Sequence, residues 1–211
     1  LETIQENVSD YYGDYIYNFD APAKYQCDGT AFVDEVNRFF PSPGNHDANN
    51  SDGLLPYLNF FTLPQGEEYY SFEWGSVTFY SLNSCAVDME EQSNWLSEQL
   101  ANPDTPFQIV YFHHSPYSPG RHGNEPKMQW DFYEQYVDLV LTGHDHIYSR
   151  ISKMDEDGLY YIVNGAGGKS LYSCSSNPLP ADQFDTFCYD SDYGAIRAVA
   201  TAHQLVLEFY A

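Results

Sequence analysis

Hydrophobic and polar positions follow two different periods along this chain. Residues 68–74 and 77–82 alternate between apolar and polar side chains on either side of a Gly-Ser pair, which predicts a β-hairpin. Residues 107–112 form a nearly continuous apolar run, as expected of a strand that is covered on both faces. Residues 92–100 place their large apolar side chains on one helical face and are followed by Pro103, so they predict an amphipathic helix.

Further elements follow from the same patterns. Strands alternate with helices in the middle of the chain and hairpins come late, which predicts an α/β sandwich of two facing mixed β-sheets flanked by helices. We expect one domain over residues 1–211, and loops over residues 48–66 and 169–192. The additional strands are expected at residues 38–41, 137–141, 159–163, 194–200 and 204–210, and the additional helices at residues 2–12 and 129–136.

The composition is that of a folded domain. The 211 residues are 43% hydrophobic and 18% aromatic, which is enough apolar surface for a sizeable core and excludes a disordered chain. No apolar run approaches the length that a membrane-spanning helix needs.

The charge is strongly negative. There are 31 acidic residues against 8 basic ones, for a net charge of −23. Such a surface repels nucleic acid and anionic membranes, so neither is expected as a partner. It also repels phosphate esters, so a phosphate-binding site would need a local positive charge, which a pair of metal ions would supply. We interpret the acidity itself as solubility at high salt, where charges are screened.

The cysteine pattern argues against a zinc ribbon, because no two cysteines form a C-x-x-C pair. A disulfide between Cys174 and Cys188 and a pair of buried free thiols both remain open. Sequons at Asn7 and Asn49 are compatible with an extracellular or secretory-pathway protein. The four cysteines are Cys27, Cys85, Cys174 and Cys188.

Histidines gather where predicted strands end. Six of the seven lie between residues 46 and 146, and five of them directly follow three predicted buried strands. The carboxyl ends of such strands meet at one edge of an α/β sheet, where ligands bind. Imidazole is the commonest metal-binding side chain, so the sequence predicts a metal site at this edge. The five histidines are His46, His113, His114, His144 and His146.

Three motifs in this order resemble the calcineurin-like metallophosphoesterases, and in particular their purple-acid-phosphatase-like branch. They are Gly44-Asn45-His46-Asp47, then His114 followed by Ser-Pro, and then Gly143-His144-Asp145-His146. The resemblance extends from about residue 36 to the end of the chain. It implies a phosphomonoesterase with a dinuclear metal centre, in which iron is paired with zinc, manganese or a second iron.

The resemblance also implies which residues bind the metals. Asn45, His114 and His144 would bind the second metal ion, and His146 would bind the first. His113 is expected to be a supporting or core residue rather than a ligand.

The remaining roles concern the substrate. His46 would contact the phosphate and protonate the leaving alkoxide, with Asp47 orienting it, and His122 would be a further substrate-binding histidine. In this mechanism a metal-bound hydroxide attacks phosphorus while the two cations neutralise the developing charge. Imidazole has a suitable pKa for the general acid.

One part of the family pattern is not matched. The first metal also needs an Asp from a DxG or DxH motif, and a GDxxY motif supplies the Asp that bridges the two ions. Gly13-Asp14 with Tyr17 matches the second motif in letters, but the polar residues before it do not form a core strand. We therefore expect Asp14 and Tyr17 to be a chance match, the first strands and both carboxylates to lie upstream of Leu1, and this chain alone to be inactive or weakly active.

Other functions remain open from the sequence. A phosphodiesterase would use the same metal core, and a non-catalytic interaction module would keep the fold without a metal pair. A structural zinc protein is disfavoured because no closed Cys/His set occurs. The partner expected is a small phosphate ester, while the natural substrate and the oligomeric state are not indicated.

Overall fold

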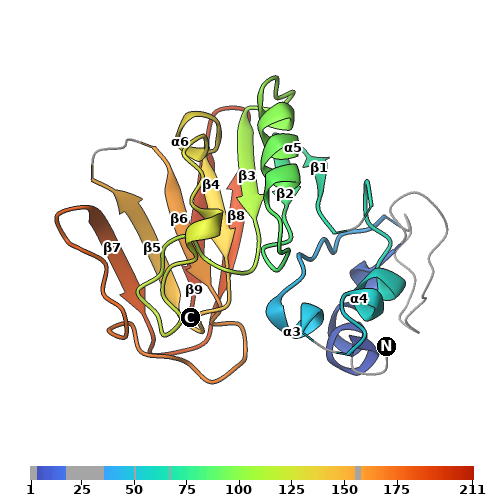
Figure 1. The fold of residues 1–211 in the computed structure, drawn as a ribbon, viewed down its shortest axis with the longest axis horizontal. Helices are drawn as coiled ribbons and strands as arrows, with labels where there is room; N and C mark the ends of the chain where they lie inside the picture. The colour runs from blue at the N-terminus through green and yellow to red at the C-terminus, as the bar shows by residue number, and fades with distance from the viewer. Residues whose placement is uncertain (1–3, 18–35, 50, 67, 155–157) are drawn as a thin grey trace.

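The computed structural model describes residues 4–17, 36–49, 51–66, 68–154 and 158–211, which form an α/β fold around a seven-stranded mixed sheet (Figure 1). The strand order is β1-β2-β3-β4-β6-β5-β7. β2, β3, β4 and β6 are parallel and make up the centre, while β1, β5 and β7 are added by antiparallel pairing. The strands are β1 Tyr70–Trp74, β2 Val77–Ser81, β3 Phe107–Tyr111, β4 Leu139–Thr142, β5 Tyr148–Lys153, β6 Tyr160–Asn164 and β7 Phe184–Tyr189.

Helices cover one face of this sheet. The helix α5 (Glu90–Leu100) buries Leu96 and Leu100 completely, and the single turn α6 (Tyr133–Tyr136) buries Tyr133. These side chains join the alternate residues of the central strands in the largest hydrophobic cluster.

The predicted hairpin is present, with Gly75 at a φ of +60° in its turn, a backbone conformation that glycine adopts without strain.

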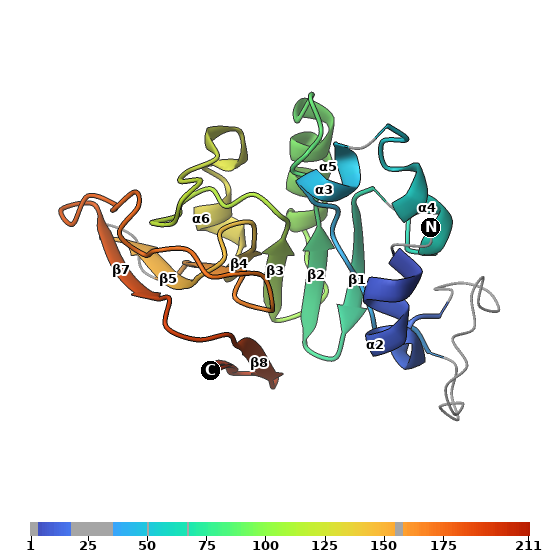
Figure 2. The same ribbon diagram turned by 90° about the horizontal axis from the view of Figure 1, so that it is seen from below.

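A second, smaller sheet covers the opposite face. It is the antiparallel hairpin of β8 (Ala195–Ala200) and β9 (Leu205–Tyr210). Its apolar side chains, including Ile196 and Leu207, pack on Ile109 and Leu139 of the large sheet. Figure 2 shows the large sheet between α5 and α6 on one side and β8 on the other. The two facing sheets are therefore unequal, since the second has two strands among the described residues.

The N-terminal part packs beside the sheet edge rather than inside it (Figures 1 and 2). A π-helical turn (Gln5–Ser9), α2 (Asp10–Tyr12) and a 3-10 turn (Gly13–Tyr15) follow one another. The helix predicted at residues 2–12 is therefore present as short helical turns. They share a satellite hydrophobic cluster with α4 (Leu55–Phe60) and Tyr70 of β1.

Several predicted elements differ from the structure. Residues 38–41 were expected to form a buried strand, but they form no strand of either described sheet, and the Arg38 amide donates to the Tyr15 carbonyl. The expected loop at 48–66 contains α4, and the expected loop at 169–192 contains β7. The strand β5 was not predicted, and only the last turn of the expected helix 129–136 forms, after a 3-10 turn at Pro126–Met128.

Candidate metal centre

The histidines meet because parallel strands end at one edge of the sheet. His113 and His114 follow β3, and His144 follows β4, its parallel neighbour. The amide of Gly143 donates to the carbonyl of His113 over 3.1 Å, which extends the pairing of the two strands into the loops. Both loops therefore leave the sheet side by side, and their side chains share the same rim.

Three donor atoms converge at this rim. The Nε2 atom of His113 lies 2.7 Å from Oδ1 of Asn45 and 3.0 Å from Nδ1 of His144. A single hydrogen on Nε2 cannot satisfy both neighbours. Ligands held about 2.1 Å from one ion lie about 3.0–3.4 Å apart, so the nitrogen pair has the spacing that a shared cation imposes.

His114 completes the group. One ligand atom from each of His113, His114 and His144 lies within 4.8 Å of the others. The ring of His114 stands 4.5 Å from that of His144 and is fixed by Ser84, which lies three residues after the end of β2 and is fully buried. The Ser84 hydroxyl accepts from the His114 amide over 3.0 Å and lies 3.0 Å from its Nδ1. Ser84 therefore orients the His114 ring, as residues around metal sites commonly do.

Burial keeps these imidazoles neutral. Desolvation, followed by the charges of His114, His144, His46 and His122, lowers the pKa of His113 to about 3. Desolvation and the nearby His114 lower the pKa of His144 to about 4, and desolvation also lowers the pKa of His114. Neutral imidazole carries the lone pair that binds a metal, so the group is ready to coordinate a cation at neutral pH.

The short helix α3 (Asn45–Ala48) presents Asn45 to this group. The Oδ2 atom of Asp47 accepts from the Gly44 amide over 2.8 Å and so fixes the start of the helix. Gly44 itself packs on His113, because a Cβ atom there would lie 2.9 Å from Nδ1 of the ring. His46 is exposed on the same turn, and its charge contributes to the lowered pKa of His113.

The turn that carries His144 is built around Asp145. His144 has a φ of +67°, a left-handed conformation that is uncommon outside glycine and recurs at functional sites. The carboxylate of Asp145 is 1% exposed and accepts from the Ser118 hydroxyl over 2.5 Å and from the His122 amide over 2.8 Å. A Cβ atom on Gly120 would lie 2.4 Å from this carboxylate, so the loop needs glycine there.

A row of rings continues the site outward. The ring of His122 lies 4.0 Å from that of His144, and it meets Tyr172 edge-on at 5.6 Å. The ring of His146 stacks on Tyr172 at 4.1 Å, and its Nδ1 lies 2.9 Å from the carbonyl of Ser170. A carbonyl partner makes Nδ1 the protonated nitrogen and leaves Nε2 of His146 with its lone pair.

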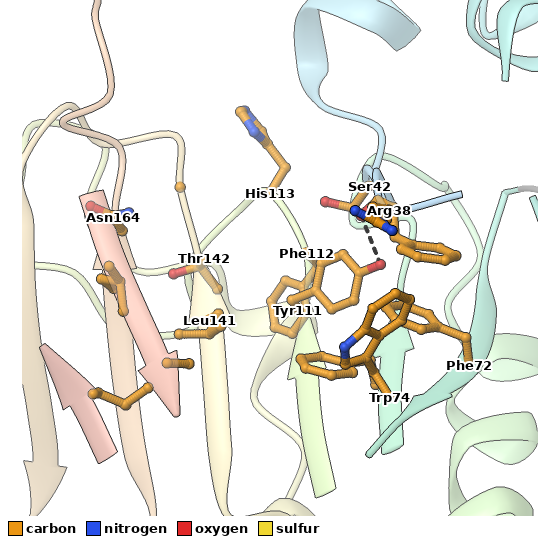
Figure 3. A pocket seen from close by; sticks show the side chains of 16 residues that line it. Arg38, Ser42, Phe72, Trp74, Tyr111, Phe112, His113, Leu141, Thr142 and Asn164 are labelled. Atoms are coloured by element: carbon orange, nitrogen blue, oxygen red, sulfur yellow. Dashed lines mark hydrogen bonds between the residues drawn. The ribbon is translucent and has the colours of Figure 1, made fainter. Parts of the chain in front are cut away.

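A cavity of about 610 Å³ lies below the histidines, between the large sheet and the β8–β9 hairpin. Figure 3 shows Phe72, Trp74 and Tyr111 along one wall and His113 at the rim, pointing away from them. Its lining is mostly apolar, and it also includes Asn164 at the end of β6. The cavity therefore opens next to His113 of the histidine group.

The structure brings together Asn45, His114 and His144 of the expected metal ligands, and His113 lies in the same group. From the sequence His113 is expected to be a supporting or core residue, and two adjacent histidines do not show by sequence alone which of them faces Asn45. His146 stands outside the group of three. The expected substrate histidine His122 contacts His144 directly.

Two other expectations concern Asp14 and the cysteines. Asp14 lies on the 3-10 turn Gly13–Tyr15 and is not part of the cluster of potential metal ligands. Among the described residues this cluster contains no carboxylate. Cys174 and Cys188 form a disulfide, which decides the alternative that the sequence left open, while Cys85 is free and Cys27 lies outside the described residues.

Comparison with known proteins identifies the class. The sequence profile of the family "Calcineurin-like phosphoesterase" matches residues 4–148, which is more than half of the chain. The chain therefore belongs to the calcineurin-like phosphoesterase family, and the relatives that it matches include purple acid phosphatases. Purple acid phosphatase 15 of Arabidopsis thaliana is 27% identical over 215 aligned residues, which cover 77% of this chain and 40% of the relative.

A further relative is similar in sequence, and two solved structures are similar in fold. Purple acid phosphatase 23 of Arabidopsis thaliana is 30% identical over 59% of this chain and 33% of its own length. The structure of the purple acid phosphatase PPD1 from yellow lupin (Lupinus luteus) seeds superposes with a TM-score of 0.70 at 22% identity, over 84% of this chain and 39% of the lupin chain. GAP50, described as the anchor in the inner membrane complex of Plasmodium, superposes with a TM-score of 0.52 at 17% identity, over 93% of this chain and 70% of GAP50.

The chain covers less than half of the length of these curated relatives. The chain spans about 40% of the length of the first curated relative and 45% of purple acid phosphatase 18. Within the described residues, none of the helices combines the length and the apolar character that crossing a membrane requires.

Proposed function

We propose that this chain carries the metal-binding and substrate-binding part of a metal-dependent phosphoric ester hydrolase that acts on phosphomonoesters. The observation that carries the proposal is the convergence of Asn45, His113 and His144, whose donor atoms lie 2.7 and 3.0 Å apart. The family membership supports phosphoester chemistry, and the relatives that are purple acid phosphatases support the monoesterase over the diesterase.

The residues present suit a divalent transition-metal ion. Imidazole nitrogen and amide oxygen are ligands for zinc, manganese and iron. We propose Asn45, His113 and His144 as ligands to one ion, with His114 beside them and His146 offering Nε2 toward a second ion. The bound cations would polarise the phosphate and lower the pKa of a water molecule, which makes it a nucleophile near neutral pH. The pairing that we propose is iron with zinc, manganese or iron.

The remaining side chains of the proposal act on the substrate. His46 is exposed beside the cluster, so it can reach a bound phosphate ester and protonate the leaving oxygen. Asp47 holds the turn that carries His46 through its bond to the Gly44 amide. His122 contacts His144 and offers a second imidazole to the phosphate oxygens.

A complete dinuclear centre needs more than the described residues bring. Two adjacent cations repel each other strongly without an anionic bridge, and the histidine group contains no carboxylate among the residues that the structure describes. We propose that carboxylates outside the described residues supply this bridge. The chain alone would then bind one divalent ion tightly and hydrolyse phosphate esters slowly.

We also propose that residues 1–211 act as one domain, and that the protein works in the secretory pathway or outside the cell. The disulfide between Cys174 and Cys188 supports the second point, because such bonds persist in oxidising compartments. The small phosphate ester is the partner that the site favours. The net charge of −23 continues to oppose nucleic acid and anionic membranes as partners.

Metal binding and hydrolysis test the proposal separately. Equilibrium dialysis against zinc should give about one tightly bound ion per chain, and His144→Ala should abolish that binding. Hydrolysis of p-nitrophenyl phosphate by the zinc-loaded chain should be slow but measurable, and His144→Ala should abolish it. Zinc binding that survives both His113→Ala and His144→Ala would refute the assigned centre, and zinc binding without any hydrolysis would favour a non-catalytic module.

A further inference from the structure

A cationic side chain stands beside the candidate centre without a counter-charge. Arg121 directly precedes His122 and is exposed, and its guanidinium lies 5.4 Å from the centre of the Tyr172 ring. Arg121 forms no ion pair with any carboxylate that the structure describes. By contrast, Lys153 pairs with Glu134, and Arg197 pairs with Glu208 over 2.9 Å. Arg150 likewise has no ion pair among the described residues, so it is the position of Arg121 next to His122 that singles it out.

The loop that carries Arg121 is fixed at its backbone on two sides. The amide of His122 donates to the buried carboxylate of Asp145. From the other side, the Asn177 side chain donates to the carbonyls of Gly120 and Arg121 over 2.8 and 3.1 Å. A backbone held in this way loses little entropy when the side chain binds a ligand, which favours recognition by Arg121.

The side chain of Arg121 is also directed by its neighbours. Tyr172 is held by its stacking on His146, whose Nδ1 is fixed by the Ser170 carbonyl. A guanidinium placed over an aromatic ring keeps its N–H groups free in the plane of the fork, where they can bind an oxyanion with two parallel hydrogen bonds. The Tyr172 ring under Arg121 also meets the His122 ring, which in turn contacts His144.

We propose that Arg121 is a specificity-determining residue that binds a second anionic group of the substrate, while the histidine centre binds the phosphate that is hydrolysed. The inference rests on the proposed function and deepens it. The guanidinium of Arg121 lies over Tyr172 and not over a ring of the histidine group, so we assign it to an anionic group beyond the scissile phosphate. The substrate class is then a phosphate ester that also carries a carboxylate or a second phosphate.

A matched pair of ligands separates the two anionic groups. We would measure the binding of 3-phosphoglycerate and of glycerol 3-phosphate to the zinc-loaded chain by isothermal titration calorimetry, because these ligands differ in one carboxylate. The wild type should bind 3-phosphoglycerate about tenfold more tightly, which is the effect of one charge-assisted contact. Arg121→Gln should remove that preference and leave glycerol 3-phosphate binding within twofold. Arg121→Lys should keep part of the preference, because the charge remains and the fork is lost.

Arg150→Gln is the control for net charge. Arg150 is also exposed and lies 6.0 Å from the ring centres of Tyr160 and Phe187, on β5. It should leave both affinities unchanged. Equal losses for both ligands in Arg121→Gln, equal effects of Arg121→Gln and Arg150→Gln, or a wild type without any preference would each overturn the proposal for Arg121.

The same titrations separate this inference from the proposed function. If the wild type binds glycerol 3-phosphate and His144→Ala abolishes that binding, the proposed centre stands, and Arg121→Gln alone decides the second-anion site. If the zinc-loaded wild type binds neither ligand, the proposed function and the role of Arg121 are both wrong.

Discussion

Replacing Asp145 by Asn keeps the shape of a buried side chain and removes its charge. The carboxylate is 1% exposed and accepts two hydrogen bonds, from the Ser118 hydroxyl and from the His122 amide. An Asn side chain has one oxygen, which the His122 amide requires because a backbone N–H only donates. The NH₂ group must then face the Ser118 hydroxyl, which already accepts from the Gly120 amide over 3.1 Å.

The cost follows from these contacts. Two bonds to a charged acceptor each contribute about 1.5–3 kcal/mol, and neutral bonds contribute about 1 kcal/mol. The Ser118 hydroxyl hydrogen is left without its acceptor, while the neutral amide is easier to bury than a carboxylate, so these two effects oppose each other. We expect a net loss of about 2–3 kcal/mol in the free energy of unfolding. For a chain of this length, that corresponds to a fall of about 5–10 °C in Tm.

Thermal unfolding followed by circular dichroism measures this loss, with Asp185→Asn as the control. Asp185 is exposed on β7, so the same chemical change there should shift Tm by less than about 2 °C. Asp145→Asn should also broaden or shift the His122 ring signals in NMR spectra, because the loop loses the hydrogen bond from the Ser118 hydroxyl to residue 145. A melting temperature within 1 °C of the wild type would refute the structural role given to Asp145.

Three further predictions concern the site and its surroundings. The metal-free protein should lose stability as the pH falls from about 6.5 toward 4. In the folded state the pKa of His113 is lowered to about 3 and that of His144 to about 4, so only the unfolded state takes up protons on these side chains near pH 6.5. Thermal unfolding in the presence of a chelator measures this, and a Tm that does not change between pH 7 and pH 5 would contradict it. Gly44→Ala should weaken zinc binding about tenfold, because the added Cβ would lie 2.9 Å from the His113 ring and must displace it. Equilibrium dialysis measures the zinc affinity, and an unchanged affinity would show that Gly44 does not hold the His113 ring in place. Replacing Cys174 and Cys188 by Ser should lower the free energy of unfolding by about 3 kcal/mol, as expected for a loop of this size. Urea unfolding under oxidising conditions measures this, and a midpoint equal to that of the wild type would contradict it.

The sequence determined the elements whose signal is local. The hairpin around Gly75, the helix α5 and the central strands β3 and β4 follow from hydrophobic periods that need no information about distant residues. The strand β5, which lies between β6 and β7, and the edge strand β7 were missed because neither contains a continuous apolar run. Their pairing with β6 and with each other supplies the order that their own residues do not encode. Residues 38–41 show the converse, since this segment is predicted as a strand but joins neither of the described sheets.

For the site, the sequence was sufficient to identify the residue types and the sheet edge, because parallel strands always deliver their C-terminal loops to the same side. The tertiary structure alone decided which histidine faces Asn45. His113 and His114 are neighbours in the chain and project differently, and only the positions of α3, β4 and Ser84 bring His113 to Asn45 and hold His114 beside it. The anchoring of the loop by Asp145 and the placing of Arg121 over Tyr172 were equally invisible in the sequence. Each depends on contacts between residues that are 23 or more positions apart, and a linear pattern does not record such contacts.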